Sequence, residues 1–157
     1  MKGRNRSGVE RAAGARVGRH VVLAARGARI VLGPGAVVGD RCQLHAAPGA
    51  VIVVEGALDE GCRLVAHASI TVEAGARLGA ECVLVDVDPV IGDVERPIRE
   101  QGSCAAPVRI AAGARLGPRV AVLRGVTVGA GATVLAHSVC TRDVAAGATV
   151  AGTPADP

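Results

Sequence analysis

The chain has 157 residues, a formal charge of +4 and 50% hydrophobic residues, yet it contains no Phe, Tyr or Trp. The hydrophobic fraction excludes a disordered chain, and no apolar run approaches the roughly 18 residues that a membrane-spanning helix needs. A core without aromatic rings must close around small aliphatic side chains, since each ring would bury about 150–250 Å². We therefore expect one domain whose backbone elements approach one another closely.

The N-terminal residues 1–15 are rich in basic side chains and are expected to be a tail. A single domain is expected at residues 16–155, followed by a short C-terminal tail at 156–157. No apolar stretch follows the basic residues, so no signal peptide is predicted. Basic residues without aromatic stacking partners are weak evidence for nucleic-acid binding, and we expect no nucleic acid. Because no apolar run is long enough to span a membrane, we expect no membrane partner either. Five cysteines without metal-ligand spacing indicate reduced thiols in a cytoplasmic protein and no metal site.

An aliphatic residue recurs every six positions through much of the chain. In the second half the blocks open at Ile110, Leu116, Val122, Val128, Val134 and Cys140. Their fifth positions are small or β-branched: Ala114, Val120, Val126, Ala132, Ser138 and Val144. A period of six fits neither a helix nor simple strand alternation, but it fits short parallel strands joined by tight turns. The sequence therefore predicts an all-β triangular solenoid of hexapeptide repeats, with about 18 residues per coil.

The first half shows the same period with interruptions. Cys42, Cys62 and Cys82 each occupy the fifth, inward-facing position of a block and are spaced 20 residues apart. Since 20 residues are one coil plus two inserted residues, the three thiols are expected to form one interior column. We interpret this column as small buried side chains that fill the core. A disulfide or metal site would need converging ligands that the sequence does not show.

The repeat lapses at residues 87–107, where a long segment rich in charged residues interrupts the solenoid. Such an excursion is usually functional, and the alternative is a plain insertion with a solvated charge cluster. The four histidines lie outside it. His20, His67 and His137 occupy the fourth position of their blocks, where a turn faces outward, and His45 occupies the second. We expect surface positions for all four, although His67 and His137 could face a groove between subunits.

Three segments carry a resemblance to a known family: APVRIAAGARLG, VLRGVTVGAGATVLAHSVCTRDV and AAGATVAGTPA. They resemble the hexapeptide-repeat acyltransferases, and specifically the maltose/galactoside O-acetyltransferase-like branch, as does the loop sequence RPIREQG. The resemblance covers about residues 17–155, and its specific motifs lie within 84–155. It implies a left-handed parallel β-helix that forms a homotrimer. It also implies transfer of an acyl group from acetyl-CoA or another acyl-CoA to a hydroxyl or amine of a small molecule, without a metal.

In the family a histidine in or beside the long loop acts as general base, since an imidazole with a pKa of about 6.5 suits the task better than a carboxylate of about 4. Here the sequence reads Asp86-Val87-Asp88-Pro89, so either Asp88 stands where that histidine is expected or the histidine is deleted before Pro89. The candidate catalytic residues are therefore Asp88, Asp86 and His67. The alternative is a catalytically impaired homologue that serves as a structural or ligand-binding trimer.

The CoA-binding positions of the family are matched better in this sequence than the catalytic histidine is. By resemblance, six residues would line the pantetheine groove or meet the CoA phosphates: Gly117, Ala136, Ser138, Thr141, Arg142 and Pro154. An arginine is a suitable phosphate partner because charge-assisted hydrogen bonds are the stronger kind. Two positions depart from the pattern: Arg115 replaces an aromatic residue, and Asp156 replaces a basic one that follows GTPA.

Overall fold

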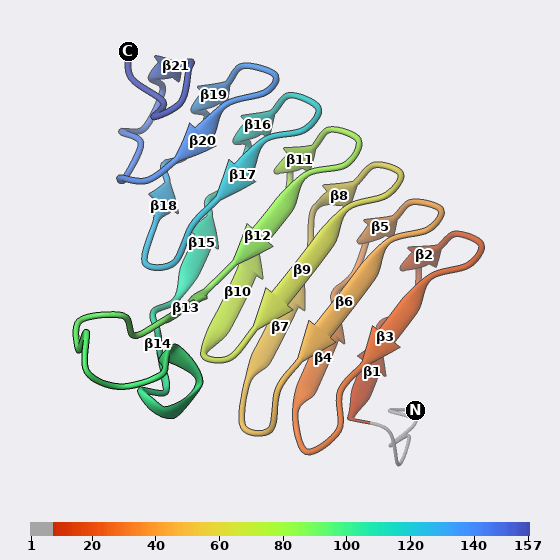
Figure 1. The fold of residues 1–157 in the computed structure, drawn as a ribbon. Helices are drawn as coiled ribbons and strands as arrows, with labels where there is room; N and C mark the ends of the chain where they lie inside the picture. Colours follow the sequence, from red (N-terminus) through yellow and green to blue (C-terminus); the bar gives the residue numbers. More distant parts are fainter. Residues whose placement is uncertain (1–7) are drawn as a thin grey trace.

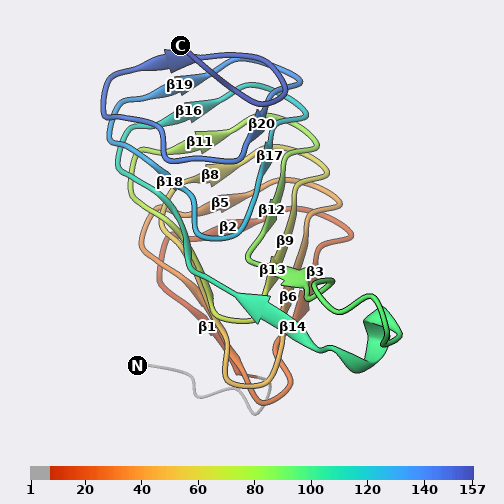
Figure 2. The ribbon, with the colours of Figure 1, turned by 60° about the vertical axis from the view of Figure 1, so that its left-hand side comes forward.

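The computed structural model describes residues 8–157, which fold into a triangular solenoid walled by three parallel sheets (Figures 1 and 2). Sheet A contains β1 (Val9–Arg11), β4 (Arg29–Leu32), β7 (Val51–Val54), β10 (Ser69–Val72), β15 (Val108–Ile110) and β18 (Thr127–Val128). Sheet B contains β2 (Arg16–Val17), β5 (Val37–Val38), β8 (Ala57–Leu58), β11 (Arg77–Leu78), β16 (Arg115–Leu116), β19 (Thr133–Val134) and β21 (Thr149–Val150). Sheet C contains β3 (Val22–Ala24), β6 (Gln43–Ala46), β9 (Arg63–Ala66), β12 (Val83–Val85), β17 (Ala121–Val122) and β20 (Val139–Cys140).

The six-residue period arises because each block supplies one wall of a coil. The openers of the second-half blocks and the residues at their fifth positions are all buried, which confirms the prediction of an all-β hexapeptide solenoid. Isoleucines or leucines of successive coils stack in register, as Ile30, Ile52 and Ile70 do in sheet A. All three are fully buried. A narrow interior filled by such columns has no room for aromatic rings, and this accounts for the composition.

Three of the five thiols form the predicted interior column. Leu44, Leu64 and Leu84 pair in register, so the coil from Cys42 to Cys62 and the coil from Cys62 to Cys82 are each 20 residues long. The three cysteines are fully buried and unpaired. Each Sγ donates a hydrogen bond to a backbone carbonyl 3.1–3.2 Å away. The neighbouring Cys42 and Cys82 side chains, together with burial, raise the pKa of Cys62.

The solenoid begins earlier than the sequence indicates. Strand β1 (Val9–Arg11) lies inside the segment 1–15 that was expected to be a tail, and it pairs in parallel with β4. Arg11 Nε and Nη2 donate hydrogen bonds to the Ala15 carbonyl oxygen at 3.1 and 2.6 Å. The basic residues at 1–7 lie outside the described residues. Within residues 8–157 no helix is long and apolar enough to cross a membrane.

The long excursion is a folded hairpin. Strands β13 (Val87–Pro89) and β14 (Ser103–Ala105) pair antiparallel at its base, and a 3₁₀ turn, η1 (Ile98–Glu100), lies near its tip. Figure 2 shows it projecting sideways from one corner of the solenoid. That corner joins the end of sheet C to the start of sheet A, so the turns that follow the strands of sheet C lie beside one another there.

Candidate functional site

Asp86 ties the base of the hairpin to the coil below. Its carboxylate is fully buried, and its two oxygens accept hydrogen bonds from the backbone N–H groups of His67 (2.7 Å) and Ala68 (2.8 Å). Its backbone carbonyl accepts from Ala106 N–H across the hairpin base at 2.9 Å. A buried carboxylate needs such donors, because an unpaired charge inside a protein is very costly. Asp86 therefore holds the bend that carries His67 and does not face a ligand.

The side-chain amide of Gln101 forms three of the hydrogen bonds that hold the tip of the hairpin together. Gln101 Nε2 donates to the carbonyls of Asp93 (2.7 Å) and Arg96 (2.8 Å), and its Oε1 accepts from Asp93 N–H (3.0 Å). The apolar side chains of the hairpin tip face solvent in the single chain: Val94 is 94% exposed and Ile91 is 65% exposed. The hairpin is thus an ordered element with an apolar surface that no other described part of the chain covers.

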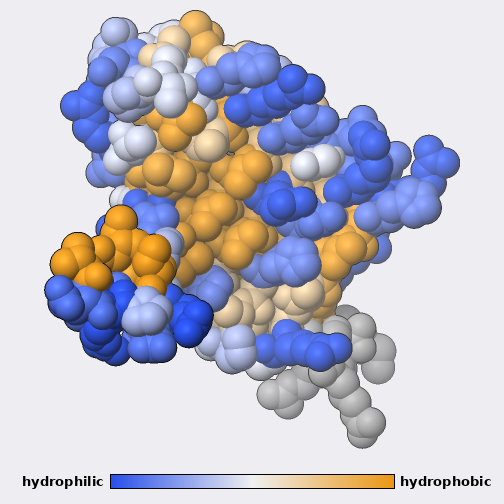
Figure 3. Space-filling view, viewed as in Figure 1, coloured by the Kyte–Doolittle hydropathy of each residue, from blue (hydrophilic) through white to orange (hydrophobic). Residues whose placement is uncertain are grey.

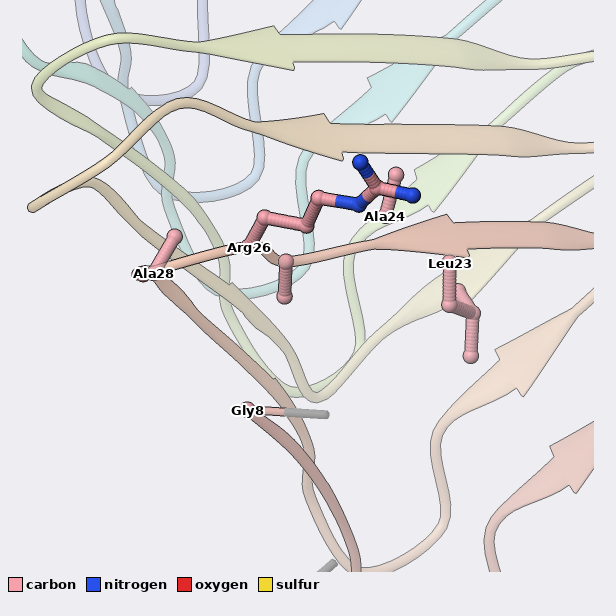
Figure 4. A pocket seen from close by; sticks show the side chains of 7 residues that line it. Gly8, Leu23, Ala24, Arg26 and Ala28 are labelled. Carbon is pink, nitrogen blue, oxygen red and sulfur yellow. The ribbon is translucent and has the colours of Figure 1, made fainter. Parts of the chain in front are cut away.

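His67 lies in a groove at the same corner. Arg26, His45 and His67 line this groove, which has a volume of about 420 Å³. The rest of its lining is small or apolar: Ala24, Ala46, Ala47, Pro48, Val65 and Ala66. A second hollow adjoins it toward the N-terminal end and shares Ala24 and Arg26. Figure 4 shows the Arg26 side chain extending from its turn toward Ala24.

Asp88 has a different environment from Asp86. It lies on β13, its side chain is 47% exposed, and its Oδ2 is 2.7 Å from Arg124 Nε. Arg124 belongs to the coil above, in the turn that follows β17. The structure thus separates the three candidate catalytic residues. Asp86 contacts the backbone of His67, whereas Asp88 pairs with an arginine that the sequence reasoning did not single out.

Gly117, Ala136 and Ser138 are brought together at the corner between sheets B and C. A Cβ at Gly117 would lie 2.7 Å from the backbone nitrogen of Ala136, so only glycine allows the two coils to stack this closely. Ser138 is fully buried, and its Oγ accepts a hydrogen bond from Gly152 N–H at 3.0 Å. At the same corner His20 and His137 are exposed and adopt positive φ angles of 56° and 62°, which confirms that they occupy outward turns.

Thr141 and Arg142 lie at the opposite end of β20, exposed in the turn that follows it. Arg142 forms an ion pair with Asp156 in the C-terminal segment. That segment contains the cis peptide bond before Pro154 and is anchored beside β20, since Ala155 N–H donates to the Val139 carbonyl at 2.8 Å. The arginine expected to meet a phosphate therefore already has an internal counter-ion.

The outer face of sheet C is apolar in its middle. Val65, Val83 and Val85 point outward from β9 and β12, and Ala121, Leu123 and Val139 continue the surface on the next coils. Figure 3 shows this hydrophobic area between the hairpin on one side and a belt of charged side chains on the other. The face lies between the Gly117 corner and the His67 corner, so it connects the two groups of candidate site residues.

The sequence alone did not indicate that Arg26 and His45 line the same groove as His67. A signal was present, because His45 and His67 are 22 residues apart, close to the length of one coil. It could not be used, since the coils at this end are 18, 20, 21 or 22 residues long and only the strand register shows which side chains meet.

Comparison with known proteins gives partial sequence matches and a fold match over nearly the whole chain. No family model matches the chain. A 58-residue stretch is 40% identical to the probable acetyltransferase Rv3034c of Mycobacterium tuberculosis, covering 37% of this chain and 19% of that protein. A 51-residue stretch is 51% identical to the 2,3,4,5-tetrahydropyridine-2,6-dicarboxylate N-acetyltransferase of Staphylococcus aureus, covering 32% of this chain and 21% of that enzyme. The chain thus aligns with only about a fifth of the length of these relatives.

The fold extends the likeness over nearly the whole chain. The hexapeptide-repeat acetyltransferase VCA0836 of Vibrio cholerae, solved with acetyl-CoA, superposes with a TM-score of 0.64 at 22% identity. The superposition covers 90% of this chain and 68% of that one, and it identifies the solenoid as the left-handed parallel β-helix of such proteins. With its six-residue period, its two local matches to acetyltransferases and this fold, the chain resembles the hexapeptide-repeat acyltransferases.

Proposed function

We propose that the protein is an acyltransferase that moves an acyl group, with acetyl as the first candidate, from acyl-CoA to a hydroxyl or amine of a small molecule. The shared β-helix fold and the local sequence matches support this, as do the names of the two relatives and the acetyl-CoA complex of the Vibrio cholerae protein. The observation that carries the proposal is His67, an imidazole in a groove beside the hairpin, on a bend that the buried Asp86 holds in place. In this proposal, His67 of the coil below takes the role of the family histidine that the hairpin lacks.

The chemistry assigned to His67 is general base catalysis. Its imidazole would take the proton from the acceptor O–H or N–H as that atom attacks the thioester carbonyl. The new acyl–oxygen or acyl–nitrogen bond forms, the acyl–sulfur bond breaks, and the imidazolium returns the proton to the departing thiolate. Such proton transfer typically contributes 10²–10⁴-fold in rate. Asp86 is assigned as a positioning residue, and Asp88, already paired with Arg124, as a group that orients the acceptor.

The donor is assigned to the surface between the Gly117 corner and the C-terminal segment. Gly117, Ala136 and Ser138 form a close-packed corner along which a pantetheine arm could run beside the backbone. Thr141, Arg142 and Pro154 at the far end of β20 are the residues placed to meet the phosphates, and Arg142 would do so in competition with Asp156. No metal has a role in this scheme, and the five free thiols support a reducing, cytoplasmic location.

A homotrimer is proposed as the working unit. The exposed apolar tip of the hairpin and the apolar outer face of sheet C support it, since both need a partner to leave water. Light scattering after size exclusion tests the assembly, with an expected mass three times the 15.6 kDa of the chain. Val94→Asp should shift it toward the monomer, and a monomeric wild type contradicts the proposal.

One observation favours a second candidate, a binding protein without turnover. The hairpin contains no histidine at all. Chromatographic detection of CoA release, with acetyl-CoA and a panel of sugars and amines, separates the two candidates. Turnover that His67→Asn abolishes supports the transferase. Calorimetric binding of CoA with no turnover by wild type, and activity gained by Pro89→His, would instead identify a degenerate site.

A further inference from the structure

The groove around His67 has a distinctive charge. Of the nine residues that line it, three carry nitrogen donors or bases and none is acidic. The nearby Asp86 carboxylate offers no acceptor to the groove, because it is fully buried and both its oxygens accept backbone N–H groups. The groove therefore offers hydrogen-bond donors and positive charge on an otherwise apolar surface, which suits an anion with a small organic body.

Arg26 differs from the arginines of the neighbouring corner. There, Arg19, Arg41 and Arg119 each pair with a carboxylate of an adjacent coil. Arg26 has no carboxylate within salt-bridge distance among residues 8–157, and its guanidinium forms no hydrogen bond there. A planar guanidinium without a partner is the side chain best suited to bind a carboxylate or phosphate through two parallel hydrogen bonds.

The spacing of Arg26 and His67 sets the size of the ligand. They occupy the same corner position two coils apart, with Ala47 between them, as the pairing of Ala24 with His45 and of Ala46 with Ala66 shows. Two coil separations span about 10 Å. The small Ala47 side chain leaves the space between them open, and His45 lies beside it on β6. A molecule with an anionic group at one end and a hydroxyl or amine at the other fits this interval.

We propose that this groove binds an acyl acceptor that carries a carboxylate or phosphate, with Arg26 holding the anionic group and His67 facing the nucleophile. That the ligand is the acyl acceptor rests on the proposed function. That the groove binds an anion does not. His45 would supply a further hydrogen bond from the side of the groove. The acceptor class thus narrows from any small hydroxyl or amine to anionic ones.

The composition of the chain provides a direct binding assay. Because there is no Phe, Tyr or Trp and there are only four histidines, the aromatic proton NMR spectrum contains the side-chain signals of His20, His45, His67 and His137 alone. Single His→Gln variants assign them. Sodium succinate and sodium phosphate are the probes, titrated against sodium chloride at equal ionic strength. His20 and His137, in exposed turns of the other corner, are internal controls.

The expected result is a saturable shift of the His45 and His67 signals with succinate, with phosphate or with both. The probe that saturates at the lower concentration identifies the preferred group. Arg26→Gln should weaken this binding about tenfold or more, because a charge-assisted contact is lost. Arg77→Gln, an exposed arginine on the outer face of sheet B, is the matched control and should leave it unchanged. Equal shifts of all four histidines, or unchanged binding in Arg26→Gln, would overturn the proposal.

Turnover separates this inference from the proposed function. With anionic acceptors, Arg26→Gln should raise KM by about tenfold or more, and by a larger factor than it lowers kcat. Anion binding at His45 and His67 without any acyl transfer would retain the anion site and refute the transferase. Robust transfer to neutral acceptors that Arg26→Gln does not alter would retain the transferase and refute the anion site.

Discussion

Replacing Asp86 with asparagine is the most direct test of how the hairpin corner is built. The substitution keeps the shape of the side chain but removes its charge and one of its acceptor oxygens. In the native protein the two carboxylate oxygens accept from His67 and Ala68 N–H at 2.7 and 2.8 Å, with no exposure to solvent. An asparagine can accept only one of these bonds, and its own NH₂ then faces the other N–H.

The magnitude follows from those two contacts. A hydrogen bond to a charged group contributes about 1.5–3 kcal/mol, and a buried N–H left without an acceptor costs about 1–3 kcal/mol. The amide is easier to bury than a carboxylate, which offsets part of the loss. We expect Asp86→Asn to lower the free energy of unfolding by about 2–4 kcal/mol, a large part of the 5–15 kcal/mol typical of a whole domain.

Urea unfolding followed by far-ultraviolet circular dichroism measures this change, since the chain has no tryptophan for fluorescence. Protein concentration is held constant so that any assembly affects all variants alike. Asp88→Asn is the matched control. Asp88 is 47% exposed and pairs with Arg124 at the surface, where an ion pair contributes about 0–1 kcal/mol. Similar losses in both variants, or none in Asp86→Asn, would refute the assigned role of Asp86.

Three further predictions concern the donor, the base and the thiols. His67→Asn should lower kcat at least about 10²-fold in the CoA-release assay while CoA binding by calorimetry persists; retained activity excludes His67 as the base. Asp156→Asn should free Arg142 and tighten CoA binding several-fold at low salt, less so at high salt; unchanged affinity removes Arg142 from the phosphate site. Burial raises the pKa of Cys140 from 9.0 to about 11, so its stabilising contribution is complete below pH 9 and lost by pH 11. Between those values wild type should lose about 2–3 kcal/mol more than Cys140→Val in urea unfolding, and parallel losses contradict this.

The repeat and its consequences could be predicted from the residues alone. A coil wall repeats every six residues, so inward and outward positions are set locally, and the burial of Ile110, Leu116 and Ala114 follows from the pattern. The interior column of Cys42, Cys62 and Cys82 could also be predicted, because their spacing of 20 residues is one 18-residue coil plus two inserted residues. The interruptions were harder to interpret. The hairpin at 87–107 has no repeat, and its strands pair across the excursion through contacts that no local period encodes.

The candidate site depended still more on the tertiary structure. Asp86 and Asp88 are two residues apart and chemically identical, yet one is buried against the amides of the coil below and the other pairs with Arg124 of the coil above. Their environments come from neighbours 18–36 residues away along the chain. The same holds for Arg142, whose counter-ion Asp156 belongs to the C-terminal segment.

The sequence by itself therefore determined the period, the inward-facing residues and the absence of aromatic rings that a narrow solenoid requires. Only the tertiary structure decided which outward-facing side chains meet. The reason is physical: burial follows from a local alternation that every coil repeats, whereas side-chain contacts on the surface depend on the register between coils. A coil that is two residues longer carries different side chains to the same corner. The groove of Arg26, His45 and His67 exists because the register of β3, β6 and β9 aligns three separate turns.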